Sequence, residues 1–159
     1  MSPDRTRSFA VKQPRVRRVL RVLDALAVAL TVLALGVGFY IAYRIEPREL
    51  LRLSLTLFIP FILVSVLRRI INAPRPAELC GDGTPSGRRG GSFPSRHAHS
   101  AFSIGTALLF LSVPLGTAVL ALGVCLGACR VLLGLHFPRD VIAGALTGSV
   151  TAVIGMLIL

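Results

Sequence analysis

The chain has 159 residues, enough for one domain, and its composition departs from that of a soluble protein. Hydrophobic residues make up 53% of it and charged residues 16%, against about a quarter charged in typical soluble domains. The net charge of +11 does not indicate nucleic-acid binding, because the basic residues precede the first apolar run or cluster at the ends of later ones. We therefore expect an integral membrane protein whose basic segments meet anionic lipid head groups.

Five apolar segments approach the roughly 20 residues that a helix needs to cross a bilayer. They cover residues 22–43, 50–71, 94–113, 114–133 and 138–159. Prolines stand near four segment starts, where a missing N–H costs nothing: Pro47, Pro94, Pro114 and Pro138. The expected fold is all-α, an integral membrane bundle of about five transmembrane helices. We expect two parts: a basic N-terminal segment, residues 1–21, and a transmembrane domain, residues 22–159.

Residues 72–96 form a long polar stretch rich in Gly, Pro and Ser, which predicts a loop. A loop of this length in a compact protein is usually functional or mobile. Within it, Arg88 and Arg89 are expected to be a solvated pair. With five spans, this loop and the turn near residue 135 lie on the same side of the membrane. Almost no loop separates the third and fourth segments, which predicts a tight hairpin.

Polar residues at the ends of apolar segments carry the most information in a membrane protein. His136 precedes a helix that begins at Pro138, and Asp140 lies one turn into that helix. An Asp so placed can reach the imidazole, fix its tautomer and favour its positive form. A histidine oriented in this way can act as a nucleophile. Arg130, at the end of the preceding segment, can face the same pocket.

Two upstream clusters complete the expected site at one membrane boundary. Ser95 has the character of an N-cap, and the free N–H groups of a first helical turn bind phosphate. His97 can protonate a leaving oxygen, and Arg68 and Arg75 suit bidentate phosphate contacts. One histidine to attack, one to protonate, and several cations and N–H donors describe phosphoryl transfer.

Three motifs run through these residues: Arg68, six residues, Arg75-Pro76; Pro94-Ser95-Arg96-His97; and Cys129-Arg130, five residues, His136, three residues, Asp140. At these residues the chain resembles the type-2 phosphatidic acid phosphatase family. The family pattern is Lys, six residues, Arg-Pro; then Pro-Ser-Gly-His; then Ser-Arg, five residues, His, three residues, Asp. The order and the internal spacing both match, over residues 68–140.

The resemblance implies a role for each matching residue. His136 would form a phosphohistidine, Asp140 would support it, and His97 would protonate the leaving group. Phosphate would be bound by the remaining motif residues: Arg68, Arg75, Ser95, the backbone of Arg96, and Arg130. The arginines would supply the positive charge, so no metal or other cofactor is expected.

Three positions depart from the family pattern: Arg68 stands for Lys, Arg96 for Gly and Cys129 for Ser. The Arg96 side chain adds bulk and charge near the phosphate, and we hypothesise that it contacts a second phosphate or the lipid head. His99, two residues after His97, points away from it on a helix, so we assign it to a polar or interfacial face.

The leading hypothesis is a bacterial cell-membrane phosphatase acting on undecaprenyl diphosphate, phosphatidate or phosphatidylglycerophosphate. The alternative is a non-catalytic membrane protein that binds anionic lipid through the same arginines. The positive charge of the N-terminus predicts a cytoplasmic active site, whereas most bacterial members of the resembled family face outward. The sequence leaves open the orientation, the substrate and the oligomeric state.

Overall fold

The computed structural model describes residues 13–79 and 90–159, and every regular element in this part of the chain is a helix. Arg88 and Arg89 lie outside the described residues. The helices are α2 (Pro14–Ile45), α3 (Pro47–Ile71), α4 (Pro76–Leu79), α5 (Arg96–Leu109), α6 (Val113–Leu132) and α7 (Pro138–Ile158). The expected all-α membrane bundle is confirmed.

Four of the helices, α2, α3, α6 and α7, are long and apolar enough to cross a membrane. Their outer faces expose large apolar side chains such as Leu33, Phe58 and Leu146. Such surfaces are stable in lipid but not in water, since burying apolar area from water is the main force in folding. The chain is therefore an integral membrane protein.

Helix α2 begins at Pro14, earlier than the expected start near residue 22. Proline fits the first turn of a helix, and the arginines that follow it are good helix formers. The basic residues from Arg15 to Arg21 therefore belong to the same helix as the apolar run. The first turns of α2, which carry these arginines, therefore lie outside the length of helix that the hydrocarbon core can surround.

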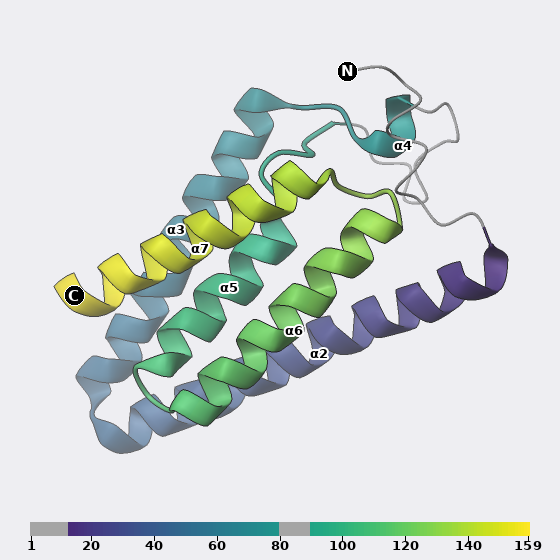
Figure 1. The fold of residues 1–159 in the computed structure, drawn as a ribbon. Coiled ribbons are helices and arrows are strands. Elements are labelled where there is room, and N and C mark those ends of the chain that lie inside the picture. The colour runs from purple at the N-terminus through teal and green to yellow at the C-terminus, as the bar shows by residue number, and fades with distance from the viewer. Residues whose placement is uncertain (1–12, 80–89) are drawn as a thin grey trace.

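Helix α5 is shorter than the predicted third segment and lies in the middle of the bundle (Figure 1). It has 14 residues, a length of about 21 Å against a bilayer core of about 30 Å. Ser95 caps its start, and the extended backbone of Ser112 ends the turn after it. Only Phe110–Ser112 separate α5 from α6, so the predicted tight hairpin is confirmed.

The closest helix packing is between α5 and α7. A Cβ atom added to Gly144 would lie 2.4 Å from the carbonyl oxygen of Ser95, and one added to Gly148 would lie 2.3 Å from that of His99. Small residues allow membrane helices to approach at backbone distance. This contact fixes the start of α5 against the start of α7, at the end of the bundle where the polar motifs lie.

We expect Gly148→Ala to lower the thermal midpoint of the protein in detergent. The new methyl group would overlap the α5 backbone, and overpacking of this kind costs about 1–3 kcal/mol. Gly36→Ala is the matched control, because a Cβ atom there meets nothing within 4 Å and alanine favours a helix. Equal midpoints for the two variants would contradict the close α5–α7 contact.

Candidate active site

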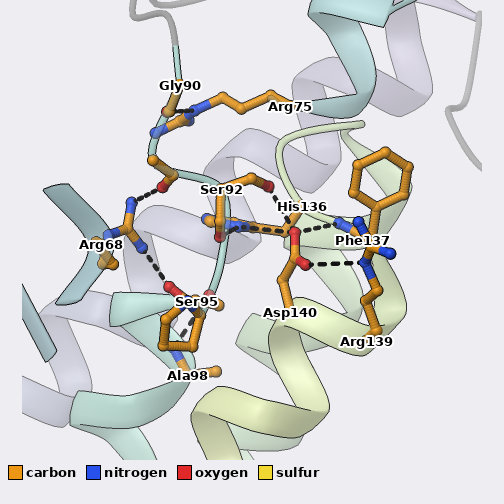
Figure 2. Close-up of polar contacts among 12 residues, drawn as sticks. Arg68, Arg75, Gly90, Ser92, Ser95, Ala98, His136, Phe137, Arg139 and Asp140 are labelled. Carbon is orange, nitrogen blue, oxygen red and sulfur yellow. Dashed lines mark hydrogen bonds and ion pairs between the residues drawn. The ribbon is translucent and has the colours of Figure 1, made fainter. Parts of the chain in front are cut away.

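His136 lies in the turn between α6 and α7, and its side chain is 3% exposed. Its Nδ1 atom lies 2.9 Å from the backbone carbonyl oxygen of Ser92 (Figure 2). A carbonyl oxygen can only accept, so Nδ1 must carry the proton in this hydrogen bond. The lone pair of the neutral ring is then on Nε2, which makes Nε2 the nucleophilic atom.

The carboxylate of Asp140 is fully buried beside this ring. Its Oδ2 atom accepts hydrogen bonds from the Ser92 hydroxyl at 2.5 Å and from the backbone N–H of Phe137 at 3.0 Å. It lies 3.8 Å from Nδ1 of His136, beyond hydrogen-bond distance. Asp140 thus reaches the Nδ1 side of the imidazole as expected, but the closer Ser92 carbonyl accepts the Nδ1 hydrogen bond. Asp140 instead holds Ser92 and adds negative charge behind the ring.

Burial lowers the pKa of His136 below its ordinary value of 6.5. The nearby Asp140 carboxylate acts in the opposite direction, whereas the charges of Arg68 and Arg75 add to the lowering. The sequence predicted that Asp140 would favour the positive form. Desolvation outweighs that effect, so the ring is held neutral and available for attack.

Arg68 and Arg75 both bind the backbone of the segment that precedes α5. Arg68, at the end of α3, donates to the carbonyl of Pro94 at 2.7 Å and to that of Gly91, and Arg75 donates from Nε to the carbonyl of Gly90 at 3.2 Å. Gly90 and Gly91 have φ of +68° and +62°, which only glycine adopts readily. A guanidinium has five N–H donors, so these bonds leave Arg68 with N–H groups for an anion.

The first turn of α5 brings the second motif to the same place. Ser95 is the predicted N-cap, confirmed by its hydroxyl accepting from the N–H of Ala98 at 3.5 Å. Its own N–H donates to the backbone carbonyl of Asp140 at 2.8 Å, which ties α5 to α7. Burial, together with the nearby charges of Arg130 and His136, lowers the pKa of His97 to about 3 in the unliganded site.

The Arg96 guanidinium lies over the ring of Phe61, 5.7 Å from its centroid. With His97 it lines a cavity of about 320 Å³ between α2, α3 and α5, whose other walls are largely apolar. The guanidinium thus sits at the polar end of an apolar cavity. Its predicted contact with a second phosphate or lipid head stays a prediction.

Arg130 is paired with Asp24 of α2, with Nε and Oδ1 2.8 Å apart and both side chains about 15% exposed. The backbone carbonyl of Arg130 also accepts from the N–H groups of Leu135 and His136. Arg130 therefore shapes the turn that carries His136 as well as contributing charge. Asp24 offsets that charge in a region of low dielectric constant, where an unpaired cation is costly.

One other residue differs from what the sequence indicated. The assignment of His99 to a polar or interfacial face is wrong: its side chain is 2% exposed and contacts Thr147 of α7. Helix α5 is surrounded by other helices, so it has little free face to offer. Cys129, which stands for the family's Ser, packs in an apolar cluster with Leu20 and Leu133.

All eight predicted site residues lie at one end of the bundle, where the charges of Arg68 and Arg75 act on His136 and that of Arg130 acts on His97. Within residues 13–79 and 90–159, no group of three His, Cys, Asp or Glu side chains could hold a metal ion. The pocket combines a neutral imidazole with a directed lone pair, a second imidazole, and several fixed cations. This arrangement can bind a tetrahedral anion and attack it.

The sequence reasoning missed Asp24, Ser92, Gly90 and Gly91. Asp24 had a usable signal, because it is an acidic residue within an apolar helix, and such residues usually have a partner or a function. The others had none: Ser92 and the two glycines resemble the rest of a loop rich in Ser and Gly. Their roles depend on contacts with residues distant in sequence.

Residues 49–159 match the PAP2 superfamily. No curated protein matches the sequence. Among solved structures, LpxE from Aquifex aeolicus is similar with a TM-score of 0.68 and 26% identity, covering 90% of this chain and 93% of that one. A transmembrane PAP2-type phosphatidylglycerolphosphate phosphatase from Bacillus subtilis shares the fold with a TM-score of 0.69 and 22% identity, covering 96% and 81%.

We expect His136 to titrate below pH 6.5 when followed by NMR in the intact protein. Arg75→Gln should raise its pKa, because a repelling cation is removed. Asp140→Asn should lower it further, because a favourable negative charge is lost. A wild-type midpoint at or above 6.5 would contradict the dominance of burial.

Asp24→Asn should lower the thermal midpoint, because it leaves the Arg130 cation without its partner. Arg130→Gln should do the same, and the double variant should lose less than the sum of the two. Thermal unfolding of the four proteins in detergent measures this coupling. Strictly additive losses would mean that the ion pair does not stabilise the fold.

Proposed function

The chain belongs to the PAP2 superfamily, and from this membership and the site geometry we propose that it hydrolyses a lipid phosphate or diphosphate through a phosphohistidine. The observation that carries the proposal is the buried His136 ring, whose Nδ1 donates to the Ser92 carbonyl at 2.9 Å. This bond leaves Nε2 unprotonated and directed, as a nitrogen nucleophile requires.

In the first step, Nε2 of His136 attacks the terminal phosphorus atom and its bond to the leaving oxygen breaks; this oxygen is the ester oxygen of a monophosphate or the bridging oxygen of a diphosphate. The bound phosphoryl dianion favours the protonated form of His97, which gives this proton to the departing oxygen. The lipid therefore leaves as an alcohol or, from a diphosphate, as a monophosphate. The phosphorylated ring keeps its Nδ1 proton and gains positive charge. Asp140, 3.8 Å from Nδ1, stabilises that charge.

In the second step, water attacks the phosphorus atom and the phosphorus–nitrogen bond breaks. The neutral His97 accepts a proton from this water, which restores both histidines and releases inorganic phosphate. Bonds and protons therefore balance over the cycle as hydrolysis. The reaction needs no group outside the protein other than water.

The oxygens of the phosphoryl group would be held by Arg68, Arg75, Arg130 and the first N–H groups of α5. These donors are fixed before substrate binds: Arg68 by two backbone carbonyls and Arg130 by Asp24. Preorganised donors stabilise developing charge without reorganisation during the reaction. We propose that Arg96, which lines the 320 Å³ cavity with His97, meets the further phosphate of a diphosphate substrate.

A lipid substrate is supported by the surroundings of His97. The cavity that His97 shares with Arg96 is lined by apolar residues such as Val28, Val32 and Leu126, so an apolar chain can lie beside the reacting group. Phosphatidate, phosphatidylglycerophosphate and undecaprenyl diphosphate fit this description, and a bacterial cell membrane is the proposed location.

Purified protein in detergent should release inorganic phosphate from phosphatidate, and His136→Ala should reduce the rate by at least about a thousandfold. Substrate labelled in the reacting phosphate should leave acid-labile label on the wild type and none on His136→Ala. Binding of phosphatidate without release of inorganic phosphate would favour the non-catalytic alternative. Unchanged release by the variant would overturn the mechanism.

His97→Asn provides the contrast within the same experiment. It should slow formation of the phosphohistidine from phosphatidate strongly but spare its formation from an aryl phosphate, whose leaving group departs without a proton. The later attack of water, in which His97 is the base, should slow for both substrates. His136→Ala should lose both activities equally. Equal slowing of phosphohistidine formation from both substrates for His97→Asn would remove His97 from its role as the acid.

A further inference from the structure

A cavity of about 450 Å³ lies between α2, α3 and the middle of α5. Its walls are mostly apolar, with Leu35 and Phe39 from α2 and Phe58 from α3. It shares Phe61, Ser100 and Ile104 with the smaller cavity that contains His97, so the two spaces are adjacent. A lipid chain attached to a phosphate beside His97 can therefore continue into it.

Three polar side chains of α5 line this mostly apolar cavity, and two of them, His99 and Ser103, are buried. Each is 2% exposed, and neither His99 Nε2 nor Ser103 Oγ has a hydrogen-bond partner within residues 13–79 and 90–159. Four residues apart, they lie on the same face of the helix. A buried polar atom without a partner costs free energy, so two of them facing one cavity indicate a ligand there.

The neighbouring helix determines which form of His99 is present. Thr147 Oγ1 donates its single proton to the carbonyl of Ala143 at 2.8 Å or of Gly144 at 3.1 Å. It must therefore accept from Nδ1 of His99, 3.2 Å away, so that Nδ1 carries the ring proton. Nε2 is then a bare acceptor on a side chain that lines the cavity, and the Ser103 hydroxyl, one helical turn further along, is free to donate.

This pair cannot replace the phosphate site. No charged side chain is among the described residues that line the cavity, and a bare Nε2 would repel an anionic oxygen. A carbonyl oxygen would satisfy Ser103 and leave Nε2 without a donor. A hydroxyl group satisfies both, because it donates to Nε2 and accepts from Ser103.

We propose that His99 and Ser103 form a subsite for a hydroxyl group on the hydrocarbon part of the lipid substrate. The inference rests on the proposed function and narrows its substrate class. His99 and Ser103 lie two and six residues after His97, about 3 and 9 Å further along the helix. That depth matches a hydroxyl near the carboxyl end of an ester-linked acyl chain, and polyprenyl chains carry no such group.

The test compares two phosphatidates of equal chain length, one with 3-hydroxyacyl chains and one with unsubstituted chains. The wild type should hydrolyse the hydroxylated lipid with about tenfold higher kcat/KM, as expected for a pair of neutral hydrogen bonds. Ser103→Ala should abolish most of this preference while keeping activity on the unsubstituted lipid. His99→Phe, which keeps a ring in place, should have the same effect on the preference.

Ser54→Ala is the matched control. Ser54 lines the same cavity, but its hydroxyl already donates to the backbone carbonyl of Leu50 at 2.7 Å, so the preference should persist. Equal kcat/KM for the two lipids in the wild type, or an unchanged preference in Ser103→Ala, would overturn the subsite and leave the phosphatase proposal intact. If the protein hydrolyses neither phosphatidate, the subsite proposal and the phosphatase proposal are both contradicted.

Discussion

The buried carboxylate of Asp140 connects three separate parts of the chain at one end of the bundle. Its Oδ2 atom holds the Ser92 hydroxyl from the loop and the Phe137 N–H from the start of α7, and its backbone carbonyl holds Ser95 at the start of α5. Ser92 in turn accepts the proton of His136. The position and tautomer of the proposed nucleophile depend on this network, which is sheltered from water and therefore strong.

A second constraint is the balance of charge at a membrane boundary. The site gathers several arginines. The protein provides partners for these guanidinium groups, and the site still carries positive charge for an anionic ligand. Arg130 faces Asp24, whereas Arg68 donates two of its N–H groups to neutral carbonyls, which leave its charge in place. The pocket thus remains electropositive at little cost, which suits the transient binding of a phosphoryl dianion.

The short central helix α5 lines two different cavities. Residue His97 lines the cavity that contains Arg96, and His99, two positions later, lines the larger apolar cavity and contacts α7. An α-helix turns by about 200° over two residues, so neighbouring histidines in sequence serve different environments. The glycines of α7 make this possible, because they bring the α5 backbone close enough for Thr147 to orient the His99 ring.

The sequence by itself determined the membrane class, the helical architecture, and the His136, His97 and Arg130 motifs, because hydrophobic length and motif spacing are local properties. It also predicted the N-cap at Ser95 from residue type alone. Only the tertiary structure decided that the Ser92 carbonyl, not Asp140, holds the Nδ1 proton, that Asp24 pairs with Arg130, and that His99 is buried. These depend on which loop or helix lies against a side chain, and contacts between residues far apart in sequence leave no periodic signal.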